Sequence, residues 1–239
     1  MIAIPDYILK ELGKHKEAEA VLLSGSRALG KESKNSDWDF YLILNENKPR
    51  WRKTYQVGNT WIELLCNDKN QIEKEFKEDL EEGRGVTTFM FATGIIVKDS
   101  KNKVLKKLVN KARSNWAKGP NILSKNRVNF IDYDISTYLQ DLEDCIYSKN
   151  IAPIFSSQAL SEFVKYYYRL GGIWMPRAKD RFPDLKKREP KLYNLITKIE
   201  RQNDWFSKAK ILIELVKFIG KKYKLTLSGN LYIPPNKNS

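Results

Sequence analysis

The sequence has 239 residues, of which 43 are Lys or Arg and 29 are Asp or Glu, so its formal net charge is +14. An apolar fraction of 41% and an aromatic fraction of 12% exclude a disordered polyelectrolyte and indicate a folded protein with a basic exterior. One histidine and two cysteines exclude a histidine-rich metal site and a disulfide framework, and they favour a reducing, cytoplasmic compartment.

The first part of the sequence alternates helical patterns with short apolar and aromatic runs that are typical of strands. In chain order, we expect a helix over residues 5–12, strands over 18–23 and 38–44, a hairpin over 54–66, and a helix over 68–82. The hairpin is expected to turn at Gly58-Asn59. Residues 86–99 fit neither pattern clearly.

The second part is helical, with apolar residues three and four positions apart. The expected helices cover residues 101–118, 124–147, 153–170, 190–199 and 204–223. We therefore predict an α+β protein in which a part that alternates helices and strands, residues 1–97, precedes a helical bundle, residues 98–226, and a loose tail, residues 227–239. No apolar run is long enough to span a membrane.

Charge is distributed unevenly along the chain. Residues 1–95 contain 14 basic and 16 acidic side chains, whereas residues 96–239 contain 29 basic and 13 acidic side chains. Residues 98–127 alone contain ten basic side chains and one acid. A surface of this kind suits a phosphate-rich partner such as RNA, although exposed lysines with no partner give the same composition.

The most informative segment lies between the first two predicted strands. Gly25-Ser26 follows the first strand, and Asp37-Trp38-Asp39 begins the second. Because side chains alternate along a strand, Asp37 and Asp39 point to the same side. Two neighbouring carboxylates repel each other unless a cation compensates them, so the pair predicts a Mg²⁺ site.

A glycine at a strand-to-helix turn allows close approach of a ligand to the backbone, and the following amides, the Ser26 hydroxyl and the charge of Arg27 suit a phosphate. Together with the carboxylate pair, this predicts phosphoryl or nucleotidyl transfer by two metal ions. A third carboxylate is expected for such a site. Glu63 is the candidate, because it is the lone acid in an apolar strand, although a solvated sheet edge would also explain it.

Residues 25–30, GSRALG, and residues 36–39, SDWD, resemble the signature of the DNA polymerase β-like nucleotidyltransferase superfamily. The resemblance covers residues 21–66. In its extended form, the signature is most similar to small bacterial proteins that include the aminoglycoside nucleotidyltransferases. It implies a small mixed sheet flanked by helices, with ATP or another NTP and Mg²⁺, two ions in the usual scheme, as the cosubstrates.

The resemblance also implies roles for individual residues. Gly25 and Ser26 would hold the nucleotide phosphates, while Asp37 and Asp39 would bind metal. Glu63 would be the third carboxylate, although the family often has Asp at this position. An intact set of three implies an active enzyme.

The helical half is similar in its order of helices to the acceptor domain of the antibiotic-modifying enzymes. The resemblance makes Lys179, after the turn at Trp174-Met175-Pro176, a candidate phosphate contact, and Asp141 or Asp144 a candidate general base. A solvated lysine and the polar face of an amphipathic helix are the alternative interpretations.

Three hypotheses about the acceptor remain open. The chain transfers a nucleoside monophosphate to a hydroxyl of a small, antibiotic-like molecule, or to RNA or a protein, or it binds NTP or RNA without catalysis. The GSRALG form of the signature favours a small-molecule acceptor, whereas a basic acceptor domain disfavours a polycationic aminoglycoside. Some members of the family complete their site across a dimer, so the resemblance leaves a homodimer open.

Overall fold

The computed structural model describes residues 3–45, 48–149 and 153–231. The chain divides into two compact units, residues 1–120 and 121–239. The elements of the first unit are α1 (Asp6–Leu12), β1 (Ala18–Ser24), α2 (Gly25–Ala28), β2 (Trp38–Leu44), β3 (Trp51–Val57), β4 (Thr60–Asp68), α3 (Lys69–Glu82), α4 (Val86–Thr93), β5 (Ile95–Lys98) and α5 (Val104–Lys118). The predicted α+β class, a mixed sheet followed by a helical part, is confirmed.

The described strands form one sheet in the order β3-β4-β2-β1-β5. Only β2 and β4 run parallel; the pairs β1–β2, β1–β5 and β3–β4 are antiparallel. The parallel pairing places Asp39 directly beside Glu63, and the antiparallel pairing places Ser24 opposite Asp39. The sheet order therefore brings the two predicted site segments together.

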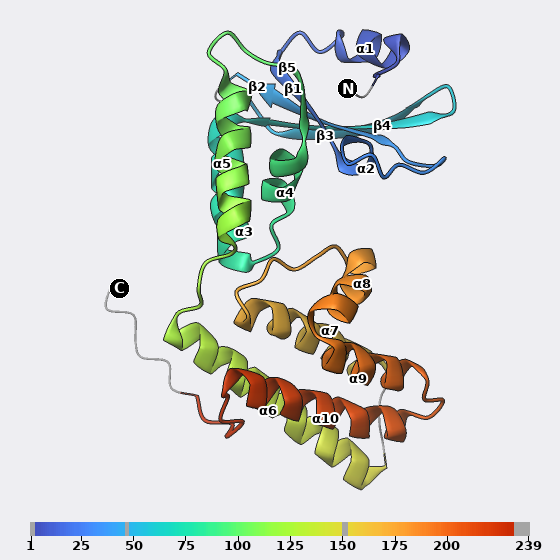
Figure 1. Ribbon diagram of the computed structural model, residues 1–239, viewed down its shortest axis with the longest axis vertical. Coiled ribbons are helices and arrows are strands. Elements are labelled where there is room, and N and C mark those ends of the chain that lie inside the picture. Colours follow the sequence, from blue (N-terminus) through green and yellow to red (C-terminus); the bar gives the residue numbers. More distant parts are fainter. Residues whose placement is uncertain (1–2, 46–47, 150–152, 232–239) are drawn as a thin grey trace. The chain divides into compact units, whose positions relative to one another are not determined.

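Apolar side chains on the two faces of the sheet form two separate cores. On one face, Ile8 and Leu12 of α1 pack against the strands. On the other face, helices α3, α4 and α5 cover the sheet (Figure 1). Because alternate residues of β2 enter opposite cores, Trp38 and Phe40 lie in the first core and Tyr41 in the second.

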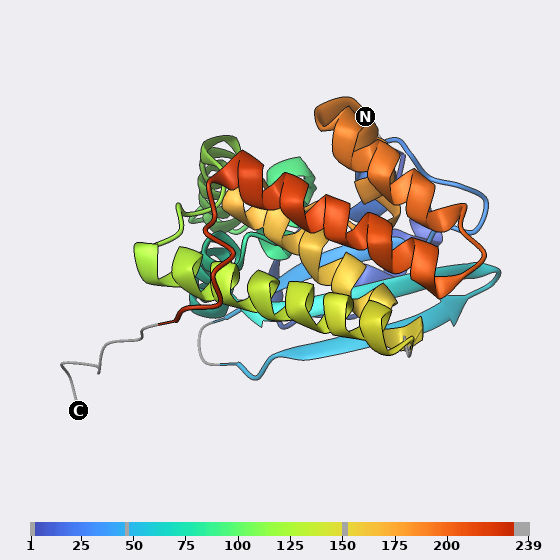
Figure 2. The ribbon, with the colours of Figure 1, turned by 90° about the horizontal axis from the view of Figure 1, so that it is seen from below.

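The second unit consists of helices. These are α6 (Lys125–Ser148), α7 (Pro153–Leu170), α8 (Ala178–Arg188), α9 (Pro190–Glu200) and α10 (Trp205–Tyr223). Helix α10 contacts α6, α7 and α9 and supplies a stripe of buried residues to the core of this unit (Figure 2). After α10, the carboxylate of Asp132 accepts hydrogen bonds from the backbone amides of Thr226 and Leu227, both at 2.9 Å. The rest of the predicted tail, residues 232–239, lies outside the described residues.

The secondary structure differs from the sequence-based expectation in two places. Helix α8 was not expected, because Pro183 lies inside it and proline usually interrupts a helix. Residues 86–99, which gave no clear pattern, form the short helix α4 and the edge strand β5. Within the described residues, every helix is too short or too polar to span a bilayer.

The basic helix α5 packs on the sheet and belongs to the first unit, whereas we expected it in the second. Its apolar stripe explains this placement, because Leu105, Leu108, Val109 and Ala112 are all buried in the core beneath the sheet. Residues 1–120 therefore contain 22 basic and 17 acidic side chains, and residues 121–239 contain 21 and 12. Both units are basic, and the excess charge is not confined to the helical one.

Candidate active site

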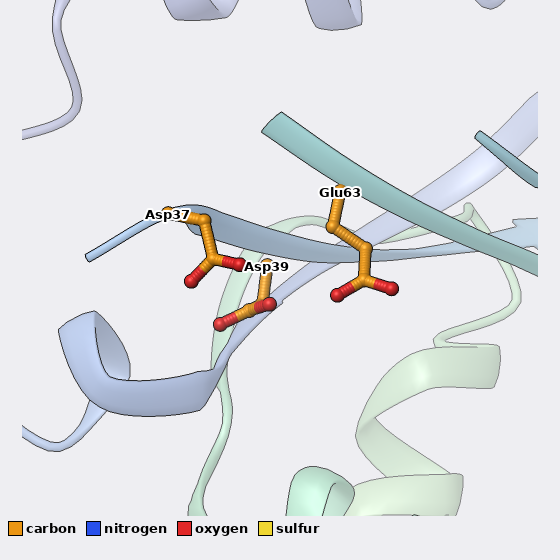
Figure 3. Close-up of side chains that lie close together, drawn as sticks. All are labelled: Asp37, Asp39 and Glu63. Atoms are coloured by element: carbon orange, nitrogen blue, oxygen red, sulfur yellow. The ribbon is translucent and has the colours of Figure 1, made fainter. Parts of the chain in front are cut away.

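Three carboxylates gather at one end of the sheet, on the face that α3, α4 and α5 cover elsewhere. Asp37 immediately precedes β2, Asp39 is the second residue of β2, and Glu63 lies beside Asp39 on β4. One carboxylate oxygen of each residue lies within 4.8 Å of the others. Figure 3 shows the three side chains pointing to the same side of the sheet. The cluster joins all three acids that the sequence predicted as metal ligands.

The electrostatics of this cluster fit a hard divalent cation. Three carboxylates at this separation repel one another, which is unfavourable unless positive charge compensates them. One oxygen of Glu63, Oε1, is buried and accepts no hydrogen bond. A buried carboxylate oxygen is costly unless positive charge compensates it, and carboxylate oxygens are the ligands that Mg²⁺ prefers.

Gly25 is required by the position of Asp39. Gly25 has φ of +71°, and a Cβ atom at this residue would lie 1.8 Å from Asp39 Oδ2. A side chain at this position would therefore displace the carboxylate. On the neighbouring strand β1, the Ser24 hydroxyl donates to the backbone carbonyl of Asp39 at 3.3 Å. The glycine that the signature requires thus allows the close approach of a metal-ligand candidate.

The side chain of Arg27 supports the loop that carries Asp37. Its guanidinium donates to the backbone carbonyls of Asp37 at 2.9 Å and of Ser36 at 2.7 Å. It also lies 4.4 Å from the centre of the Trp38 ring, a cation–π contact. These contacts explain the pairing of arginine with the Ser-Asp sequence that follows it in the signature. Ser26 remains partly exposed beside Gly25.

A buried polar network fixes the two site strands further along the same face. The Asn67 amide donates to Tyr41 Oη at 3.0 Å and to Glu75 Oε1 at 2.9 Å, and Tyr41 donates to Glu75 at 3.2 Å. Burial, and then the charge of Glu75, raise the pKa of Tyr41 above its ordinary value. The phenol therefore stays protonated and links β2 and β4 to α3.

One residue of the site, Arg52, was not predicted from the sequence; it forms an ion pair with Glu63 Oε1. Thr54 lies opposite Glu63 in the hairpin, so Arg52, two residues away on β3, faces the same side. The sequence signal for Arg52 is the turn at Gly58-Asn59, because this turn fixes the pairing of β3 with β4 and therefore the position of every side chain on β3.

The candidates in the second unit occupy exposed positions. Asp141 and Asp144 lie on the exposed face of α6, and Lys179 is exposed in the first turn of α8. In the tyrosine run of α7, Tyr167 and Tyr168 are buried in the helical core. The roles of Asp141 and Lys179 stay predictions.

Comparison with known proteins agrees with this geometry. Residues 7–103 match the family described as polymerase beta, nucleotidyltransferase, and the match includes Gly25 and all three carboxylates. A solved structure of a nucleotidyltransferase-like protein from Exiguobacterium sibiricum 255-15 has a similar fold, with a TM-score of 0.52. It is 11% identical in sequence, and the similarity covers 92% of this chain and 76% of that one. No curated protein matches the sequence.

Proposed function

We propose that the chain transfers a nucleoside monophosphate from an NTP to an acceptor hydroxyl, because residues 7–103 match the polymerase beta nucleotidyltransferase family. In this reaction the hydroxyl oxygen bonds to the α-phosphorus of the NTP. The bond from that phosphorus to the bridging oxygen breaks, and pyrophosphate leaves. The hydroxyl proton is lost to a base or to water. The observation that carries the proposal is the cluster of Asp37, Asp39 and Glu63.

Different residues of the chain would bind the metal and contact the nucleotide. Asp37, Asp39 and Glu63 would hold Mg²⁺, and Gly25 and Ser26 would contact the NTP phosphates. Mg²⁺ bound there would neutralise the phosphates and lower the pKa of the attacking hydroxyl. Arg27 would keep Asp37 in place through the carbonyls that it binds.

The order of the strands suggests where the acceptor approaches. Strand β1, which leads into Gly25, and strand β3 lie on opposite sides of the carboxylates. In-line transfer places the leaving and attacking oxygens on opposite sides of the phosphorus. With the phosphates at Gly25, the acceptor would therefore lie over β3, whose residues facing the Glu63 side are Arg52, Thr54 and Gln56. This surface carries no acid, which favours a neutral or anionic small-molecule acceptor over a polycationic aminoglycoside.

RNA is the second candidate acceptor, and helix α5 is the observation that favours it. Its exposed face is lined by Lys106, Lys107, Lys111 and Lys118, opposite the buried apolar stripe. Lys111 is paired with Glu73 on α3, at 3.0 Å. A row of lysines on one helix face suits a phosphate backbone, and binding to it would weaken steeply with salt.

The experiment uses NTPs labelled at the α-phosphate, with Mg²⁺ and separate pools of tRNA, aminoglycosides and lincosamides. We expect the label to appear on a small molecule in the wild type and to be absent with Asp39→Asn. Label on RNA alone would establish the second candidate. The absence of pyrophosphate release with every NTP and acceptor pool would contradict the proposed function.

A further inference from the structure

Arg52 on β3 contacts the carboxylate cluster through Glu63 Oε1. Its side chain is 66% exposed, whereas that of Glu63 is 16% exposed. We propose that Arg52 is a displaceable counter-cation: it neutralises Glu63 while no metal is bound and leaves Glu63 when a divalent cation binds. This inference rests on the proposed function, because it assigns Glu63 to the metal.

The hairpin places Arg52 within reach of Glu63 without directing it into the core. Arg52 pairs with Leu65 and Thr54 pairs with Glu63, so Arg52 and Glu63 are diagonal neighbours on one face. Long side chains span this diagonal. Strand β3 lies at one edge of the sheet, and most of the arginine side chain therefore remains in water.

The contact compensates charge without fixing the arginine in place. The contact between the guanidinium and Glu63 Oε1 is an ion pair, and its arginine is mostly exposed. Ion pairs with one exposed partner contribute little to stability and are easily exchanged. A divalent cation bound by three carboxylates attracts the same oxygen more strongly than the Arg52 guanidinium does.

Other arginines near the cluster are engaged elsewhere, which makes the exchange specific to Arg52. Arg27 donates to the carbonyls of Ser36 and Asp37 and lies over the Trp38 ring. Arg50, two residues from Arg52, pairs with Glu75 at 3.6 Å. Arg50 is therefore a matched control: it has the same charge and similar exposure, and its carboxylate partner lies outside the cluster.

The exchange predicts competition between Arg52 and the metal. The test is a titration of nucleotide-free protein with Mn²⁺, with free Mn²⁺ followed by electron paramagnetic resonance. We expect Arg52→Gln to bind Mn²⁺ about two- to fivefold more tightly than the wild type, because the competing charge is gone. Arg50→Gln should bind like the wild type. Unchanged binding by Arg52→Gln would overturn the proposal. Weaker binding would also overturn it, because Arg52 would then be a residue that positions Glu63 for the metal.

A double-mutant cycle isolates the pair. In protein that carries Glu63→Gln, the further change Arg52→Gln should leave Mn²⁺ affinity unaltered, because the partner is already neutral. A gain equal to that in the wild type would show a general charge effect and overturn the proposal. If the wild type binds Mn²⁺, Asp37→Asn does not, and Arg52→Gln equals the wild type, this inference fails while the proposed function stands. If neither the wild type nor Arg52→Gln binds Mn²⁺, both fail.

Discussion

The carboxylate cluster of the first unit differs from three acidic side chains of the second unit in how its charge is compensated. In the second unit, Asp184, Asp134 and Asp132 accept hydrogen bonds from donors of the same unit. Tyr168 and Arg188 donate to Asp184, Tyr166 donates to Asp134, and the backbone that follows α10 donates to Asp132. In the first unit, three carboxylates lie close together, and the cationic partner of the buried oxygen of Glu63 is the exposed Arg52.

This difference distinguishes carboxylates that stabilise the fold from carboxylates that form the candidate metal site. A carboxylate that receives donors stabilises the fold, because its desolvation is offset locally. Carboxylates that gather close together repel one another, which destabilises the fold, and they persist where a cation compensates them. Substitution should therefore have opposite effects at these two sets of carboxylates. A change in the cluster should remove activity and retain stability, whereas a change at Asp184 or Asp132 should reduce stability and leave metal binding at the cluster intact.

The sharpest test of this contrast is Asp37→Asn. We expect Mg²⁺-dependent nucleotide transfer to fall by about 1,000-fold or more, because a ligand to the metal is lost. The free energy of unfolding should be unchanged or slightly higher, since repulsion within the cluster decreases. Pyrophosphate release and urea unfolding measure the two quantities. A variant that keeps its activity would remove Asp37 from the site.

The next largest effect is expected at Gly25, the glycine that leaves room for the Asp39 carboxylate. We expect Gly25→Ala to lower activity by about 100-fold, because its Cβ displaces the carboxylate. It should also destabilise the protein by about 2 kcal/mol through backbone strain. Gly30→Ala is the control, because Gly30 has φ of +62° and nothing lies within 4 Å of the position that its Cβ would take.

Gly30→Ala should cost about 1 kcal/mol of stability from the left-handed backbone alone and leave nucleotide transfer intact. Steady-state transfer rates and urea unfolding of the two variants provide the comparison. Equal activity of the two variants would show that the closeness of Gly25 to Asp39 has no functional role.

In the second unit, Asp184→Asn should reduce stability by about 1–2 kcal/mol at neutral pH and leave Mn²⁺ binding unchanged. Burial opposes ionisation of Asp184, but hydrogen bonds from Arg188 and Tyr168 outweigh it and lower the pKa of the carboxyl below 3.8. This stabilisation is present above the unfolded pKa and is lost as the pH falls through the lower folded pKa. The wild type and the variant should therefore converge in acid, as urea unfolding from neutral pH down to about pH 3 would reveal. A constant difference across that range would contradict the assignment.

The smallest effect is expected for Asp132→Asn. The carboxylate accepts hydrogen bonds from Thr226 and Leu227, and an amide accepts through one oxygen only. We expect a loss of about 1 kcal/mol and faster hydrogen exchange at these two amides, with the core of α10 unaffected. Unchanged exchange at Leu227 would mean that the contacts do not hold this segment.

Much of the fold was predictable because its elements are coded locally. The apolar runs of β1 and β2 and the Gly58-Asn59 turn specify strands and a hairpin within a few residues. Helix α8 was not predictable, since Pro183 argues against a helix until neighbouring helices stabilise it. The position of α5 was also not predictable: its charged face suggested the basic half, and burial of its apolar stripe decided otherwise.

The candidate site divides in the same way. Gly25, Asp37 and Asp39 were identified because their spacing between two predicted strands is typical of a site for metal and phosphate. Glu63 was identified because an acidic side chain in an apolar strand is unfavourable unless it has a partner. Arg52 was missed, because a basic residue on an exposed strand has no distinctive local pattern. The clash that makes Gly25 obligatory was also missed, since it involves the side chain of Asp39 on the next strand.

Local sequence dictates which strands carry the carboxylates and on which side of each strand they lie, because alternation along a strand is a property of the local backbone. Only the assembled sheet makes β2 and β4 neighbours, so that Glu63 meets Asp39 and Arg52 meets Glu63. Those contacts depend on strand order and on the burial of apolar faces, which join residues distant in the chain. Burial also assigned the lysine-rich helix α5 to the unit that holds the carboxylates.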